Sequence, residues 1–245
     1  MPPTLYIVPT PLGGDPAAAL PAPVLASVRA LRDFVAEDAK TARKFLAAIE
    51  LPCPIQDLRI EELNEHTPAV QVPALLAPLR ADRNLGLLSE AGCPVVADPG
   101  AALIEAAHEE GHRVVPLVGP SAVLLALMAS GFEGQQFAFC GYLPREDAMR
   151  TQRIREIEAR SRAEHQCQIF IETPYRNDSL FGALLGHCRS DTRVCVATDL
   201  TLPGEEIATR TVAAWKGTQH RIGKRPTVFL LLAAGGSKLP RGRNA

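Results

Sequence analysis

The sequence predicts an α/β protein of two domains, with a mainly parallel first sheet and a mixed second sheet. Short β-branched runs alternate with helical patterns, which favours parallel strands joined by crossover helices. The length of 245 residues fits one to two domains of roughly 150 residues each. Residues 206–212 alternate as an antiparallel edge strand does. We expect domains at 1–118 and 119–235, with a flexible tail over 236–245.

The first half of the chain accounts for the parallel sheet. An apolar run at 5–8 ends at a segment rich in Pro and Gly, and apolar residues between 24 and 31 share one helical face. Asp38 follows the strand predicted at 34–36 and is expected to cap a helix over 39–48. The remaining predictions are strands at 54–58, 85–88 and 113–117 and helices over 68–81 and 101–110.

The second half predicts the mixed sheet. Segment 116–122 opens an apolar helix, with Pro120 expected in its first turn. A strand at 137–140 precedes a charged helix over 147–163. Further strands are predicted at 168–172, 194–198, 206–212 and 227–232.

Composition excludes several classes of protein. Hydrophobic residues make up 47% and charged residues 22%, so the chain can bury a core. The net charge of −1 is not that of a protein that coats nucleic acid through bulk charge. No apolar run approaches the roughly 20 residues that span a bilayer, and the N-terminus lacks the pattern of a signal peptide, so we expect no membrane association.

The six cysteines are dispersed and form no CxxC pair. This spacing predicts neither a zinc site nor a disulfide scaffold, and we expect no metal and a reduced, cytoplasmic compartment. Cys93 has no evident partner base and is expected to be a packing residue.

Four predicted strand ends carry unusual residues, and ligands of open α/β sheets bind beyond such ends. Segment 89–100 holds two carboxylates, a hydroxyl, two glycines and two prolines, more than a connector needs. The other three are 9–14, 116–122 and 172–177. None shows the GxGxxG or Walker pattern of nucleotide-binding loops, so the residues themselves predict only a ligand at the sheet edge.

Together, these segments resemble a known family. The order VPTPLGG, AEDAKTARKFL, NEH, LLSEAGCPVVADPG, VVPLVGPSA, FCGYLPR, FIETPYR and TDLTLPGEEI is similar to that of the tetrapyrrole methylase superfamily, and most similar to its branch that methylates a ribose 2′-hydroxyl of small-subunit ribosomal RNA. The resemblance covers residues 5 to about 232. It implies S-adenosylmethionine bound in a cleft between the domains, and a homodimer.

Carried over by residue, the resemblance implies a set of cofactor contacts. These are Pro11, Gly13, Ser89, Glu90, Ala91, Gly92, Ser121, Ala122, Tyr142, Leu143, Leu200 and Thr201.

Methyl transfer to a hydroxyl needs a general base, because a neutral hydroxyl is a poor nucleophile. The candidates are Glu37, Asp38 and His66, with Glu90 able to serve as base or to orient the cofactor. Asp38 is equally well explained as a helix cap, and His66 as a surface residue. Lys40, Arg43 and Arg176 are candidates for holding substrate phosphate, although such side chains are more often solvated charges or members of ion pairs.

Two other functions stay open at this point. The same fold and cofactor could serve a small-molecule acceptor such as a tetrapyrrole, which the modest charge and the lack of a further helical segment after the last predicted strand favour. The protein could also bind the cofactor as a sensor without turnover.

Overall fold

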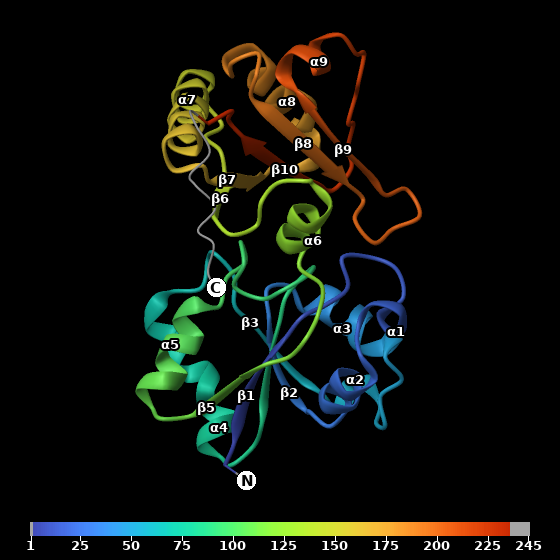
Figure 1. Cartoon of the computed structure of the whole chain (residues 1–245). Coiled ribbons are helices and arrows are strands. Elements are labelled where there is room, and N and C mark those ends of the chain that lie inside the picture. Colours follow the sequence, from blue (N-terminus) through green and yellow to red (C-terminus); the bar gives the residue numbers. More distant parts are fainter. Residues whose placement is uncertain (1, 236–245) are drawn as a thin grey trace, which may run out of the picture. The chain divides into compact units, whose positions relative to one another are not determined.

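The computed structural model describes residues 2–235, so the predicted tail over 236–245 lies outside the described residues. The chain divides into two compact units: unit 1 runs to Ser121 and unit 2 begins at Ala122. Each unit contains one five-stranded sheet, and both sheets can be followed in Figure 1.

The sheet of unit 1 is entirely parallel, in the order β3-β2-β4-β1-β5. Its strands are β1 (Thr4–Val8), β2 (Asp33–Ala36), β3 (Arg59–Glu62), β4 (Leu85–Leu88) and β5 (Arg113–Pro116). The central strands β2 and β4 are buried along their whole length, as expected for a sheet covered on both faces.

Helices cover both faces of this sheet (Figure 1). The connecting elements are α1 (Pro16–Ala19), α2 (Ala22–Arg29), α3 (Ala39–Ala48), η1 (Ile55–Asp57), η2 (Ala69–Leu76), α4 (Ala77–Arg80) and α5 (Ala101–Glu109). Helices α2 and α3 bury Val28 and Leu46 in one cluster with Phe34. Leu79 of α4 and Leu103 of α5 belong to a second cluster with Val35. Adjacent residues of β2 therefore point to opposite cores.

The sheet of unit 2 is mixed, in the order β6-β7-β10-β8-β9. Strands β6 (Phe137–Tyr142) and β7 (Cys167–Ile171) run parallel, whereas β10 (Thr227–Leu232), β8 (Arg193–Thr198) and β9 (Glu206–Thr211) pair antiparallel. The predicted antiparallel edge strand is confirmed as β9. The predicted fold class is confirmed in both sheets.

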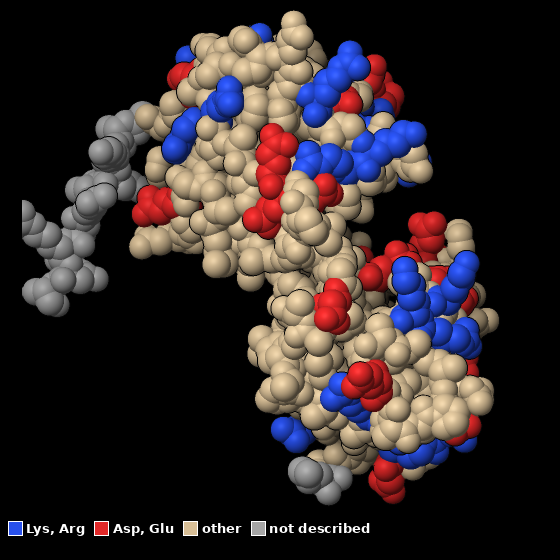
Figure 2. Space-filling model, turned by 90° about the vertical axis from the view of Figure 1, so that its right-hand side faces the viewer, with Lys and Arg blue, Asp and Glu red and all other residues tan. Residues whose placement is uncertain are grey.

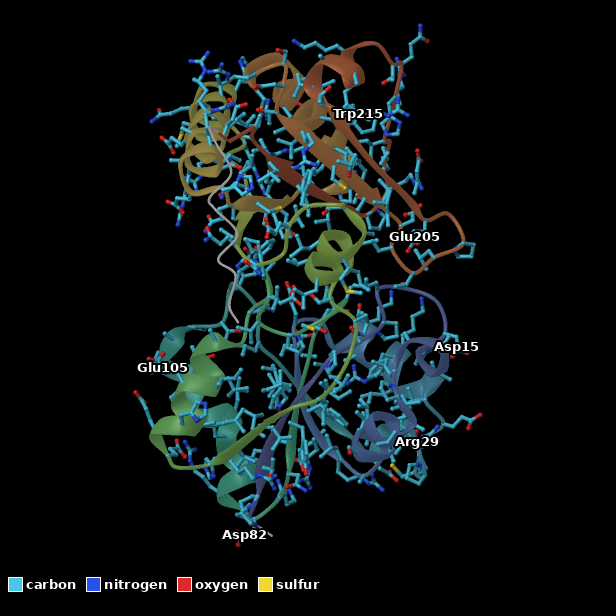
Figure 3. The ribbon with its side chains drawn as sticks, viewed as in Figure 1. Asp15, Arg29, Asp82, Glu105, Glu205 and Trp215 are labelled. Carbon is cyan, nitrogen blue, oxygen red and sulfur yellow. The ribbon has the colours of Figure 1, made fainter. Side chains whose placement is uncertain are left out.

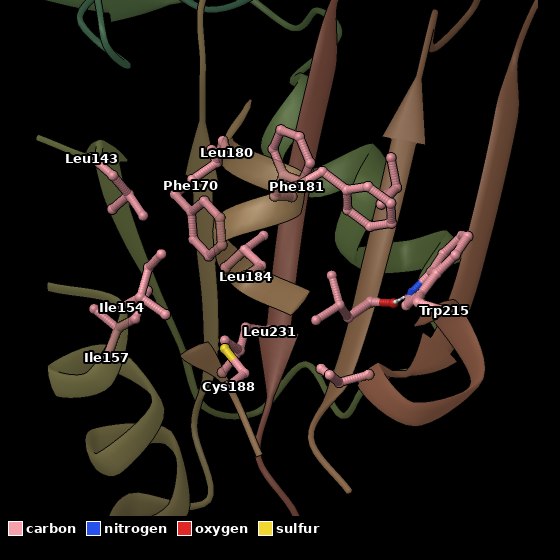
Figure 4. Close-up of a cluster of buried hydrophobic side chains, with 14 of the residues drawn as sticks. Leu143, Ile154, Ile157, Phe170, Leu180, Phe181, Leu184, Cys188, Trp215 and Leu231 are labelled. Atoms are coloured by element: carbon pink, nitrogen blue, oxygen red, sulfur yellow. Dashed lines mark hydrogen bonds between the residues drawn. The ribbon is translucent and has the colours of Figure 1, made fainter. Parts of the chain in front are cut away.

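One face of this second sheet is packed by α7 (Asp147–Glu164), α8 (Asn177–His187) and α9 (Val212–Lys216). In that cluster the indole of Trp215 lies edge-on to Phe181, with ring centroids 5.2 Å apart, and its Nε1 donates to the carbonyl of Val194 at 2.9 Å (Figure 4). Helix α6 (Ala122–Ala129) packs against β10. The short η3 (Pro174–Arg176) leads into α8.

Three sequence predictions are wrong in detail. Residues 54–58 are not a strand: η1 lies there, and the third strand follows at Arg59–Glu62, because Pro54 cannot donate to a ladder. The helix predicted over 68–81 is mostly 3₁₀, since Pro73 lies inside it. Pro120 precedes α6 rather than occupying its first turn, and α8 and α9 were not predicted.

Within residues 2–235, no helix is both long and apolar enough to cross a bilayer.

Candidate active site

Four segments leave the same edge of the unit 1 sheet. Because the strands are parallel and Leu88 pairs with both Val8 and Ala36, the residues that follow β1, β2 and β4 begin side by side. Strand β5 joins the same edge through the pairing of Ile7 with Pro116. Segments 9–14, 37–38, 89–100 and 117–121 are thereby gathered at the edge where the sequence predicts a ligand.

Hydrogen bonds fasten these segments to one another. The backbone amides of Thr10 and Gly92 each donate to the other's carbonyl, at 2.9 and 3.0 Å. The buried hydroxyls of Thr10 and Ser89 lie 3.1 Å apart, and Ser89 also donates to the carbonyl of Gly92. The thiol of Cys93 donates to the carbonyl of Pro120 at 3.4 Å. Burial raises the pKa of that thiol, which keeps it protonated and agrees with its predicted packing role.

Two glycines permit this close approach. A Cβ on Gly119 would lie 2.3 Å from Cγ of Pro9, far inside van der Waals contact. Gly92 has a φ of +85°, and a Cβ there would lie 3.1 Å from Leu12. Both positions need a residue without a side chain, so the loops after β1, β4 and β5 form one tightly joined structure.

The loop after β4 also has an unusual backbone. Val95 and Ala97 have φ values of 72° and 70°, in the left-handed region that non-glycine residues seldom adopt, and Gly100 has a φ of 132°. Such conformations cost free energy and cluster at functional sites.

Carboxylates gather at this edge. Burial, together with the nearby Glu37 and Glu90, raises the pKa of Asp98 to about 6. One oxygen of the Asp98 carboxyl is buried without a hydrogen-bond partner. Burial, then Glu90, Glu65 and Asp38, raise the pKa of Glu37. The edge therefore carries concentrated negative charge, and Glu37 and Asp98 hold their protons more tightly than isolated carboxyls do.

The three predicted catalytic residues have different environments in the structure. Glu37 belongs to the cluster of carboxylates that also includes Glu90 and Asp98. The Asp38 side chain accepts from the amide of Thr41 at 2.6 Å and caps α3, and this contact lowers the pKa of Asp38. The His66 side chain is 84% exposed, with its Nε2 3.6 Å from Glu65. Its geometry is that of a surface residue.

The predicted cofactor residues fall into two groups. Pro11, Gly13, Ser89, Glu90, Ala91, Gly92 and Ser121 belong to unit 1 and lie in the gathered loops. Ala122, Tyr142, Leu143, Leu200 and Thr201 belong to unit 2.

The predicted cofactor residues of unit 2 differ from one another in their exposure to solvent. Tyr142 is 55% exposed, whereas Leu143 is 2% exposed and packs in the hydrophobic cluster. The amide of Thr201 donates to Glu205, which Figure 3 labels, at 2.8 Å.

The three predicted phosphate-binding side chains are also divided between the two units. Lys40 and Arg43 are exposed on α3 in unit 1. In unit 2, Arg176 pairs with the buried carboxylate of Glu172 at 2.5 Å. The Arg176 charge is thus partly neutralised within the chain.

Sequence reasoning missed Asp98 as a separate candidate. The signal was its place among Val95, Ala97 and Gly100, but the left-handed backbone of the two non-glycine residues is invisible in sequence. No group of three or more side chains suited to a metal ion occurs among the described residues.

Comparison with known proteins assigns the chain to a family. No family model matches it. A protein named ribosomal RNA small subunit methyltransferase I from Mesorhizobium japonicum is 33% identical over 86% of this chain and 68% of its own length. A protein of the same name from Vibrio cholerae is 35% identical over 84% of this chain and 67% of its own.

Solved structures agree on the fold. The methyltransferase CobJ superposes with a TM-score of 0.63 at 18% identity, over 96% of this chain and 95% of its own. The relatives and the fold together define a methyltransferase with the tetrapyrrole methylase fold. Within that class, the chain belongs to the ribosomal RNA small subunit methyltransferase I family.

Proposed function

We propose that this methyltransferase transfers the methyl group of S-adenosylmethionine to a ribose 2′-hydroxyl of small-subunit ribosomal RNA. The observation that carries the proposal is the joined set of loops after β1, β4 and β5, with Gly92 and Gly119 at their contacts. The names of the relatives support ribosomal RNA as the acceptor.

The gathered loops fit the proposed cofactor. S-adenosylmethionine supplies an electrophilic methyl group on a sulfonium cation, and the carboxylates of Glu37, Glu90 and Asp98 give the edge a negative potential that favours a cation. Backbone amides and carbonyls of 11–13 and 90–91 would hold its polar groups. The proposed cofactor contacts in unit 1 are Pro11, Gly13, Ser89, Glu90, Ala91, Gly92 and Ser121. In unit 2, Ala122, Tyr142, Leu143, Leu200 and Thr201 stay proposed contacts, on the resemblance to the family.

Glu37 is the proposed general base. Its side chain is half-buried, and its raised pKa brings it closer to neutral pH, where a carboxylate accepts a hydroxyl proton more readily. Asp38 would act on the reaction through the position of α3, because its oxygen is already engaged by Thr41. His66, Lys40, Arg43 and Arg176 remain candidates for contacts with the acceptor. We further propose that the protein acts as a homodimer in the cytoplasm.

The test is transfer of labelled methyl groups. Purified protein, S-adenosylmethionine labelled in its methyl group and extract from cells lacking the protein are incubated, and RNA, protein and small molecules are separated before counting. Label in small-subunit RNA that becomes resistant to alkaline cleavage at one nucleotide supports the proposal, because a 2′-O-methyl group removes the attacking hydroxyl.

Other outcomes choose among the alternatives. Label confined to small molecules would assign a different acceptor, such as a tetrapyrrole, to the same fold. Tight binding of S-adenosylhomocysteine without transfer to any fraction would indicate a sensor. A Glu37→Gln variant should bind S-adenosylhomocysteine normally and lose about 10²–10⁴-fold in transfer rate if Glu37 is the base.

A further inference from the structure

An exposed aromatic ring in unit 2 lies beside an unpaired cation. The Tyr175 side chain is 79% exposed, although large aromatic residues usually contribute to cores. The Lys224 ammonium lies 4.9 Å from the centre of its ring. Arg221 is also exposed and stands three residues before Lys224 in the loop that leads to β10. We call Tyr175, Arg221 and Lys224 the Tyr175 surface.

Hydrogen bonds fix the two segments that carry this surface, the start of α8 and the loop before β10, relative to each other. Asn177, which begins α8 directly after η3, is fully buried, and its Nδ2 donates to the carbonyl of Arg225 at 2.7 Å and to that of Gly223 at 3.2 Å. Asp178 accepts from the amide of Ile222 at 2.8 Å. Residues 222–225 are thereby fixed against the start of α8, so Lys224 and Tyr175 are presented together.

The cations of this region differ in how they are paired. Arg225 lies between Asp199 and Glu206, and Arg176 is paired with Glu172. Arg221 and Lys224 are exposed, and no carboxylate partner for either is found among residues 2–235. These two charges are therefore free to meet a polyanion.

The charge of the chain is also unevenly divided. Residues 1–121 hold nine Lys and Arg against fifteen Asp and Glu, whereas residues 122–245 hold seventeen against twelve. Figure 2 shows several Lys and Arg side chains gathered on one face of unit 2. This excess of cations favours unit 2 as the part of the chain that makes phosphate contacts.

We propose that the Tyr175 surface binds an unpaired base and adjacent phosphates of the RNA substrate. An exposed ring with a cation over one face suits single-stranded RNA, because an unpaired base stacks on the opposite face while the cations contact phosphate. This inference rests on the proposed function, since it assigns part of the RNA contact to residues outside the proposed cofactor and catalytic sites.

Fluorescence anisotropy tests the surface. The full-length protein is titrated into labelled single-stranded oligouridylate, and into a labelled duplex RNA of equal length, at several salt concentrations. Tyr175→Ala should weaken single-strand binding by roughly 5- to 100-fold, whereas Tyr175→Phe, which keeps the ring, should stay within about twofold. Lys224→Ala should reduce the slope of log affinity against log salt by about one. Arg155→Ala on α7 is the matched control, because Arg155 is also exposed and cationic.

The outcomes separate this inference from the proposed function. Each variant is also titrated with S-adenosylhomocysteine, whose unchanged affinity shows that the fold is intact. If wild-type protein methylates small-subunit RNA but Tyr175→Ala binds oligouridylate as tightly as wild type, the Tyr175 surface is wrong and the proposed function stands. If wild-type protein neither binds nor methylates RNA, both are wrong.

Discussion

Burial disfavours the charged form of the Asp98 carboxyl and raises its pKa. Its pKa is about 6, against 3.8 for an unperturbed carboxyl, so the folded protein binds this proton more tightly than the unfolded chain does. Stability is therefore lost as pH rises between about 4 and 6, and the full cost is present above that window. Asp98→Asn should raise stability at pH 8 by about 1–2 kcal/mol after allowance for solvent screening, and by less at pH 4.5.

Thermal unfolding at the two pH values measures this effect. Glu105→Gln is the control, because Glu105 is exposed on α5 (Figure 3). A gain for Asp98→Asn that is equal at both pH values would contradict the assignment, since only the charged carboxyl is penalised by burial. Loss of methyl transfer in the stabilised variant would further show that the acidic group is kept for function.

Asp38 is predicted both to cap α3 and to act in catalysis, and the structure shows the cap. Asp38→Ala removes the cap of α3 and should lower the unfolding midpoint by roughly 2–4 °C. Asp38→Asn keeps an oxygen for the amide of Thr41 and should leave the midpoint and the transfer rate near wild type. A large loss of transfer in a normally stable Asp38→Asn protein would instead make the carboxylate catalytic.

At the scale of elements, the contact between the loops after β1 and β5 depends on Gly119. Gly119→Ala forces a methyl group against Pro9, and overpacking of this kind costs about 1–3 kcal/mol. Because the loops are joined, we expect affinity for S-adenosylhomocysteine to fall as well. Gly182→Ala in α8 meets nothing within 4 Å and should be neutral or slightly stabilising. Calorimetric titration and chemical denaturation of both variants measure these changes, and equal effects would contradict the role of the loop contact.

Elements with strong local signals were predictable, and those defined by tertiary contacts were not. The helix over 39–48 was predicted correctly because Asp38 and the apolar face of α3 lie in one local pattern. The strand β3 was misplaced because its sequence, RIEE, is charged and lies at the sheet edge, where pairing with β2 rather than hydrophobicity makes it a strand. The cluster of Glu37, Glu90 and Asp98 could not be predicted from the sequence. Glu37 and Asp98 come close only because β2 and β4 are neighbours in the sheet, and the sequence does not give the order of the strands.

At the scale of the molecule, the net charge of −1 is the sum of an acidic unit 1 and a basic unit 2. The proposed cofactor is one small cation held by short-range contacts, so its binding should change little with salt. RNA binding releases counterions from phosphate, so its affinity should fall steeply as salt rises from 50 to 200 mM. Measured side by side, S-adenosylhomocysteine affinity should vary less than about threefold while RNA affinity falls at least tenfold. Equal salt dependence of the two ligands, or an RNA affinity insensitive to salt, would instead favour a small-molecule acceptor, because such a substrate requires no phosphate contacts.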